Sequence, residues 1–113
     1  MSCVPQFDVC RKRGDTFAEV FQLKVNGAAQ DITGDTLLLT VNRDREPADT
    51  VNQLFQLTGT HVDDAAGIFS FSPSAVQPVD PGTYYYDVQW DDGVQKRTIL
   101  QGKWTVEQDI TKT

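Results

Sequence analysis

The residues of this chain that could do chemistry are mostly carboxylates. They include two adjacent pairs, Asp63-Asp64 and Asp91-Asp92, and a single acid, Asp80. Two carboxylates can divide acid and base roles when both face one substrate in different surroundings. Neighbouring residues in a strand or turn tend to point apart, and both pairs stand beside Gly or Ala. The pattern therefore predicts solvated turn residues. A calcium loop is the lesser alternative, because acids at alternating positions are missing.

The other candidates for catalysis or metal binding stand apart from one another. His61 is the single histidine, and Cys3 and Cys10 are the two cysteines, which gives no recognised metal-ligand spacing. A disulfide across so short a loop is disfavoured in a cytosol, so we expect free thiols. The serines lack a nucleophile-elbow context, and the eight glycines are dispersed rather than gathered into a phosphate cradle. The sequence predicts no enzyme, no cofactor and no metal.

Apolar residues that recur at every second position describe the elements that carry these side chains. Positions 17 to 25 place one face on Phe17, Glu19, Phe21, Leu23 and Val25. This is the core face of a strand, apart from Glu19. Residues 26–35 (NGAAQDITGD) follow as a connection, and 36–44 (TLLLTVNRD) as the next strand. Residues 53–73 give two short strands and a third near 68–71. The prolines of 74–82 (SAVQPVDPG) predict a crossover between layers.

The last two segments, residues 83–90 (TYYYDVQW) and 95–110 (QKRTILQGKWTVEQDI), read as a hairpin. Tyr84, Tyr86, Val88 and Trp90 share one parity, which predicts that they face the core. A three-residue loop, 91–93, keeps the apolar faces of both strands together and places Gly93 at the left-handed position of such loops. This register puts Trp90 opposite Val94 and Tyr84 opposite Leu100. Tyr85, on the other parity, is expected to face outward.

About seven short strands spaced by turn residues indicate an all-β antiparallel β-sandwich. We expect a single domain over residues 1–113, with a core at about 11–107, an amino-terminal arm and a short carboxy-terminal tail. The 39% of hydrophobic residues suffices for one core.

The charge balance indicates which partners to expect. Sixteen acids against ten bases give a net charge of −6, which repels nucleic acids and anionic membranes. No apolar run approaches the ~18 residues of a membrane helix, and the first residues lack the apolar segment of a secretion signal. We therefore expect no nucleic-acid or membrane partner, and synthesis in a cytoplasm.

Several segments together resemble a known family. DPGTYYYDVQW resembles the entry to the sixth strand of immunoglobulin-like domains: Asp80, Gly82 and Tyr84 match, and Tyr86 stands where a cysteine recurs. With RGDTF, DITGDTLLLTV, GIFSFSPSAVQPVDPGTYYYDVQ and KRTILQGKWTVEQDIT, in that order, the chain resembles tailed-bacteriophage immunoglobulin-like domains over residues 11–111. These are typified by the amino-terminal domain of the baseplate upper protein, which carries receptor-binding proteins. The resemblance implies an immunoglobulin-like sandwich.

The function that this resemblance implies is assembly in a virion. We expect a non-enzymatic adaptor of the tail, baseplate or fibre attachment, present in multiple copies and bound to other phage structural proteins. The expected contacts are the arm of residues 2–12, the tail of 107–113, the basic cluster Arg11, Lys12 and Arg13, and the outward Tyr85. A capsid decoration protein is one alternative. A carbohydrate-binding module with exposed aromatic residues around Tyr85 is the other.

Arg13-Gly14-Asp15 is also the tripeptide by which adhesive proteins engage cell-surface receptors. An adhesive copy is expected at an exposed loop tip of a secreted protein. In the resembling domains the run opens the long core strand, where Gly14 permits a bend and Asp15 binds backbone groups. We therefore interpret the tripeptide as structural.

Overall fold

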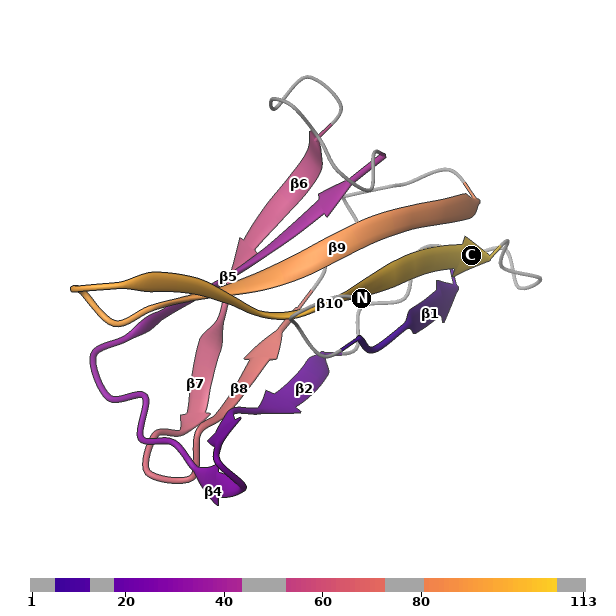
Figure 1. The fold of residues 1–113 in the computed structure, drawn as a ribbon. Coiled ribbons are helices and arrows are strands. Elements are labelled where there is room, and N and C mark those ends of the chain that lie inside the picture. The colour runs from indigo at the N-terminus through magenta and orange to yellow at the C-terminus, as the bar shows by residue number, and fades with distance from the viewer. Residues whose placement is uncertain (1–5, 13–17, 44–52, 73–80, 108–113) are drawn as a thin grey trace.

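The computed structural model describes residues 6–12, 18–43, 53–72 and 81–107 (Figure 1). These residues form ten β-strands: β1 (Val9–Lys12), β2 (Glu19–Gln22), β3 (Lys24–Val25), β4 (Ala28–Ala29), β5 (Thr36–Asn42), β6 (Gln53–Thr58), β7 (Thr60–Asp63), β8 (Ile68–Phe71), β9 (Gly82–Asp91) and β10 (Lys96–Glu107). The all-β prediction is confirmed. None of the described residues belongs to a helix that is long and apolar enough to cross a membrane.

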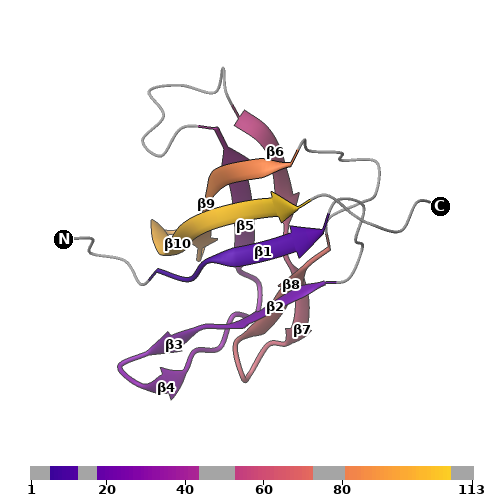
Figure 2. The ribbon, with the colours of Figure 1, turned by 90° about the vertical axis from the view of Figure 1, so that its right-hand side faces the viewer.

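Two sheets form the layers of a β-sandwich. The larger sheet has the order β1-β10-β9-β5-β6, and the smaller has the order β2-β8-β7 (Figures 1 and 2). Neighbours pair antiparallel, except that β1 runs parallel to β10 with Val9 opposite Trp104. The short β3-β4 hairpin extends from the end of β2. The sandwich predicted from the two-residue alternation is therefore present.

The core lies between the two sheets and follows the predicted parity. The larger sheet contributes side chains that are at most 7% exposed, among them Leu37, Leu39, Val41, Tyr84, Tyr86, Val88, Trp90 and Trp104. The smaller sheet contributes Phe69 and Phe71 from β8. Phe21 of β2 stacks on Phe69 with 5.9 Å between ring centroids. Alternate residues of each strand therefore fill one continuous core.

The segment predicted as one strand over positions 17–25 divides at Leu23. Its parity is as expected, since Glu19, Phe21 and Val25 are half-buried and Leu23 is buried. Leu23 joins two ladders, because its N–H donates to the Gly67 carbonyl just before β8 and its carbonyl accepts from Gln30 just after β4. The connection predicted at residues 26–35 therefore begins as the β3-β4 hairpin.

The hairpin of β9 and β10 corrects the predicted register. Trp90 lies opposite Arg97, Tyr84 lies opposite Trp104, and residues 92–95 form a four-residue loop. The three-residue loop is therefore wrong. A bulge between Thr98 and Leu100 shifts the pairing by one residue and returns the apolar side chains of β10 to the core face. The positive φ expected at Gly93 is present, at 89°.

Candidate assembly surfaces

The expected amino-terminal arm is in part a strand of the larger sheet. The Phe7 N–H donates to the Gln101 carbonyl at 2.9 Å, and the Lys103 N–H donates to Asp8 Oδ1 at 3.0 Å. From Val9 to Lys12 the chain then pairs with β10. The arm predicted over residues 2–12, with a core from about residue 11, is therefore a strand of the sheet from Val9 on. The reason is that Val9 and Arg11 occupy the inward positions of a strand.

A buried tyrosine and a glycine hold this amino-terminal segment in place. The Tyr86 hydroxyl donates to the Phe7 carbonyl, and burial raises the pKa of that hydroxyl well above its ordinary value. The hydroxyl therefore stays protonated and able to donate. A Cβ at Gly102 would lie 2.2 Å from the Phe7 carbonyl oxygen. Only glycine lets the segment pass this close to β10.

Arg11 is an interior residue. It is 5% exposed, and its Nη1 lies 2.8 Å from Glu19 Oε1, an ion pair between strands of the two sheets. Its guanidinium carbon is 6.0 Å from the ring centroid of Trp104. Figure 2 shows β1 and β2 side by side, where this pair joins the two layers. The prediction of Arg11 as a contact to neighbouring subunits is corrected, because its charge is used inside the domain.

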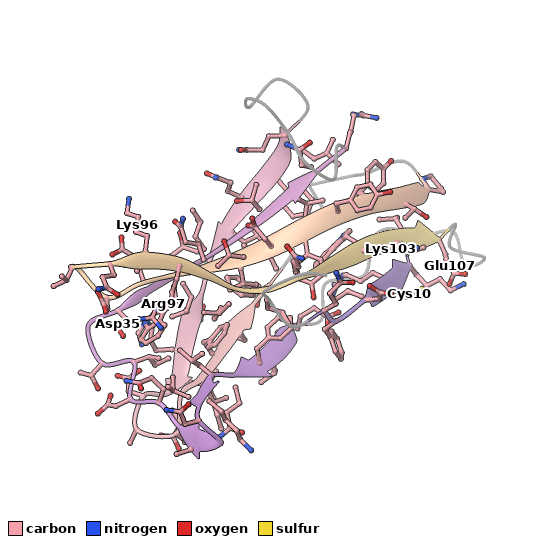
Figure 3. The ribbon with its side chains drawn as sticks, viewed as in Figure 1. Cys10, Asp35, Lys96, Arg97, Lys103 and Glu107 are labelled. Carbon is pink, nitrogen blue, oxygen red and sulfur yellow. The ribbon has the colours of Figure 1, made fainter. Side chains whose placement is uncertain are left out.

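Lys12 lies on the surface as predicted. Its ammonium is 3.3 Å from Glu107 Oε1, and both side chains are about half exposed. The Cys10 thiol donates to the same carboxylate at 3.4 Å (Figure 3). Hydrogen bonds from Cys10 and Lys12 lower the pKa of Glu107, while the bond to Glu107 raises the pKa of Cys10. Arg13, with Gly14 and Asp15, lies outside the described residues.

Tyr85 points to the outer face of the larger sheet but is only partly exposed. It lies between Asn42 of β5 and Lys103 of β10. The most exposed large apolar side chains of the described residues are Phe7, Val20, Val62 and Val94, of which only Phe7, at 54%, is aromatic. Phe7 packs edge-on against Phe21, away from Tyr85. The described part of the chain thus gathers no exposed aromatic group around Tyr85.

Asp87 is a surface feature that the sequence analysis missed. It lies on the same outer face as Tyr85, opposite Thr40 on one side and Gln101 on the other. Partial burial raises the pKa of its carboxyl. In TYYYDVQW, Asp87 shares the parity of Tyr85, and this position in the sequence could have placed it on the outer face. A half-buried carboxylate among neutral side chains marks the centre of this face.

The adjacent acids lie where strands end: Asp63 and Asp91 are the last residues of β7 and β9, and Asp64 and Asp92 begin the loops that follow. The prediction of turn residues is confirmed for Asp64 and Asp92. Asp92 Oδ1 accepts from the N–H groups of Val94 and Gln95 at 2.9 and 2.7 Å, and Asp91 Oδ1 accepts from Gly93 at 2.9 Å. Asp63 Oδ1 accepts from Ala66 at 3.2 Å in the turn before β8. In the described ranges no three acids, cysteines or histidines are grouped to hold a metal ion.

Asp92→Ala is expected to destabilise the domain more than Asp91→Ala, because it removes two bonds to the loop backbone instead of one. The Asp92 hydrogen bonds lower the pKa of its carboxyl, so its stabilisation is present above the unfolded pKa and is lost as pH falls through the folded value. Urea unfolding at pH 7 and pH 3 measures both effects. Equal midpoints for the two variants at pH 7 would contradict this assignment.

His61 ties two loops together at one end of the sandwich. Its Nδ1 lies 2.5 Å from Asp64 Oδ1, and its Nε2–H donates to the Asp35 carbonyl at 2.8 Å. The Asp35 carboxylate in turn accepts from Trp90 Nε1 at 2.8 Å, and Arg97 lies 5.2 Å from the centroid of the Trp90 ring (Figure 3). The bond to Asp64 raises the pKa of His61, with the Asp35 carbonyl contributing.

The stability of the folded chain should therefore fall when His61 loses its proton. Because the folded pKa is raised, the stabilisation is complete below the unfolded value of about 6.5 and disappears as pH rises through the folded value. An NMR titration of this single histidine is expected to show a pKa above 6.5 that Asp64→Asn lowers. Asp63→Asn, next in sequence but bonded to Ala66, is the matched control. An unchanged His61 pKa in Asp64→Asn would contradict the ion pair.

No protein-family model matches the sequence, and no curated protein matches it. The N-terminal domain of phage TP901-1 ORF48 superposes with a TM-score of 0.59 at 16% identity, covering 88% of this chain and 83% of that one. CopC from Methylosinus trichosporium OB3b superposes with a TM-score of 0.48 at 8% identity, covering 99% of this chain and 91% of that one. An uncharacterized protein from Bacillus anthracis str. Ames superposes with a TM-score of 0.45 at 15% identity, covering 92% of this chain and 85% of that one. The fold is thus shared with a domain of a phage protein.

Proposed function

We propose that this domain is a non-enzymatic structural part of a tailed-phage particle, acting as an adaptor in the tail, baseplate or fibre attachment. The observation that carries the proposal is the fold shared with the N-terminal domain of phage TP901-1 ORF48 over 88% of the chain. The ordered run of segments that resemble phage immunoglobulin-like domains supports it independently. Its action is to bind neighbouring subunits of a symmetric particle.

The strand order supports the immunoglobulin-like part of the proposal. In variable-type immunoglobulin sandwiches an additional strand extends the sheet of the third, sixth and seventh strands. Here β5, β9 and β10 form the centre of the larger sheet, and β6 extends it. The smaller sheet, β2-β8-β7, then corresponds to the second, fifth and fourth strands. Tyr86 of β9 stands where the cysteine of the sixth strand recurs in that fold, and its ring packs against Trp104 of the neighbouring β10, with ring centroids 5.6 Å apart.

The proposed contacts are residues that the domain does not use to hold itself together. Lys12, with its exposed ion pair to Glu107, is one. Arg13 follows it in the sequence, and Tyr85 lies beside the half-buried Asp87 on the outer face of the larger sheet. A neighbour that covers this face would bury a carboxylate that is already partly desolvated. That neighbour should therefore supply a hydrogen-bond donor or a basic group.

Mass spectrometry of separated heads and tails tests the proposal, using particles produced by the genome that encodes the chain. Peptides of this protein are expected in the tail fraction. Peptides in the head fraction would favour the capsid decoration alternative. Absence from both fractions would exclude a structural role in the particle. Binding of the purified protein to a glycan array, without any presence in particles, would favour a carbohydrate-binding module instead.

A further inference from the structure

The outer edge of β6 in the larger sheet has no neighbouring strand among the described residues (Figure 1), so its outward backbone groups are available to pair with another chain. Through Gly59 the chain passes directly into β7, which is likewise the last strand of the smaller sheet. Residues 53–63 therefore form one continuous edge of the sandwich, six residues in one sheet and four in the other.

The part of this edge from Phe55 to Thr58 lacks the devices that usually prevent strands from pairing with other chains, because the bulges of the two edge strands lie outside it, before Phe55 and after His61. Edge strands are commonly protected by charged side chains, especially lysine, or by proline. The opposite edges carry such charges, Arg11 and Lys12 on β1 and Glu19 on β2. From Gln53 to Thr60, by contrast, every side chain is uncharged in a protein of net charge −6. The edge of β6 is therefore suited to pairing.

The hydrogen-bond pattern shows which backbone groups of β6 are presented outward. The Gly59 N–H donates to the Leu37 carbonyl at 2.7 Å, so these two residues form a bonded pair. Bonded pairs alternate along an antiparallel ladder, which makes Leu57 with Leu39, and Phe55 with Val41, the next ones. The N–H and C=O groups of Gln56 and Thr58 consequently point away from β5, toward the free edge.

The side chains of the edge favour a second copy of the same strand. Phe55 and Leu57 face inward and pack on the core, Phe55 at 6.1 Å from the Trp104 ring, yet both are only partly buried. In an antiparallel pairing of two copies with Gln56 opposite Gln56, the outward N–H and C=O groups of one β6 strand meet those of the other. This pairing also places each Phe55 opposite the Leu57 of the other copy, so each covers the part that the other leaves exposed. The strand is complementary to itself in this register.

We infer that two copies of this protein associate through antiparallel pairing of their β6 edges, with a two-fold axis at Gln56. The two larger sheets then form one sheet across the dimer, and the two cores meet at the Phe55–Leu57 pairs. The inference goes beyond the proposed function and does not depend on it, because the edge can pair whether or not the domain belongs to a particle. Pairing along so short an edge predicts a weak dimer.

Sedimentation of the full chain under reducing conditions, from about 10 μM to about 1 mM, tests the inference. We expect a reversible rise from the 12.6 kDa monomer to twice that mass. Hydrogen exchange should show protection of the Gln56 and Thr58 amides that increases with concentration. A monomer at all concentrations would overturn the inference, as would a dimer in which these amides remain unprotected. The reducing conditions exclude a disulfide dimer through Cys10, the free and exposed thiol.

A charge exchange at the axis locates the interface. Gln56→Lys and Gln56→Glu each place like charges opposite each other, so each variant alone should dimerise at least about fivefold more weakly. An equimolar mixture of the two should associate at least as tightly as the original protein. Thr36→Lys, on an exposed position of the same sheet away from the edge, is the control.

Thr36→Lys carries the same change in net charge as Gln56→Lys. In a protein of net charge −6 this change lowers the repulsion between copies and would by itself favour association. Circular dichroism verifies that each variant retains the fold. Undiminished dimerisation of Gln56→Lys would place the interface elsewhere and overturn the inference. A mixture no tighter than the single variants would exclude an axis at Gln56.

Discussion

Arg11→Met is expected to lower the free energy of unfolding by about 3 kcal/mol, because it leaves the carboxylate of Glu19 without its cation. The Arg11 and Glu19 side chains are 4% and 19% exposed, so water replaces little of the lost interaction. Arg11 also contacts the face of Trp104, which adds to the loss. Urea unfolding followed by tryptophan fluorescence measures the change.

Lys12→Met is the matched control for this substitution. Lys12 is the next residue in the same strand and also pairs with a glutamate, but its side chain is 47% exposed. Exposed ion pairs contribute about 0–1 kcal/mol, so a small effect is expected. The double variant Arg11→Met with Glu19→Leu should recover much of the loss, because the carboxylate that Arg11→Met leaves without its cation is then removed as well. Equal losses for Arg11→Met and Lys12→Met would contradict the interior role of Arg11.

Gly102→Ala is expected to lower the free energy of unfolding by about 3 kcal/mol, because it displaces the amino-terminal segment from β10. The added Cβ would lie 2.2 Å from the Phe7 carbonyl oxygen and 2.8 Å from its carbon, both backbone atoms. Relief requires the segment to move, which separates Phe7 from the Tyr86 hydroxyl and strains or exposes β1. Hydrogen exchange should show loss of protection at the Phe7 and Lys103 amides, in addition to the fall in stability.

Gly93→Ala provides the complementary control. A Cβ at Gly93 meets nothing within 4 Å, but φ is 89°, so only backbone strain of about 1–2 kcal/mol is expected. The Phe7 and Lys103 amides should keep their protection in this variant. If Gly102→Ala leaves those amides protected, the close approach at Gly102 does not decide how the segment docks.

Periodicity predicted the centre of the fold well. On β9 the alternation is regular, and residues assigned to the core, such as Tyr84, Val88 and Trp90, are buried there. The reason is that β9 lies inside the larger sheet, where burial of one face imposes the pattern most strictly. The acids of the turns were also assigned correctly, because Asp beside Gly has a specific local bonding role.

The contact between β1 and β2, where Arg11 pairs with Glu19, was harder to predict, because its inward-facing residues are charged and not apolar. The run Arg11-Lys12-Arg13 suggests a basic surface cluster, yet the parity of Arg11 matches that of the buried Val9. Glu19 was recognised as the exception on an otherwise apolar face. Opposite charges at inward positions of two successive strands are the signal that could have revealed the pair.

The hairpin register failed for a different reason. A bulge at Ile99 adds one residue to β10 without any glycine or proline to mark it. A four-residue loop with a bulge and a three-residue loop without one both place the apolar residues of β10 on the same face of the sheet as the apolar residues of β9. Alternation therefore could not distinguish them, whereas the bonds of Asp92 to the loop backbone, visible only in three dimensions, stabilise the longer loop.

The parallel pairing of β1 with β10 also determines how the domain resists mechanical load. Val9 lies opposite Trp104 and Lys12 opposite Glu107, so the first and last strands of the described residues run side by side in the same direction. Tension applied through the two ends of the chain pulls these strands past each other along their length. The hydrogen bonds between them are then loaded simultaneously in shear instead of being peeled apart one at a time. A domain of this design transmits force through its terminal strands without first unzipping.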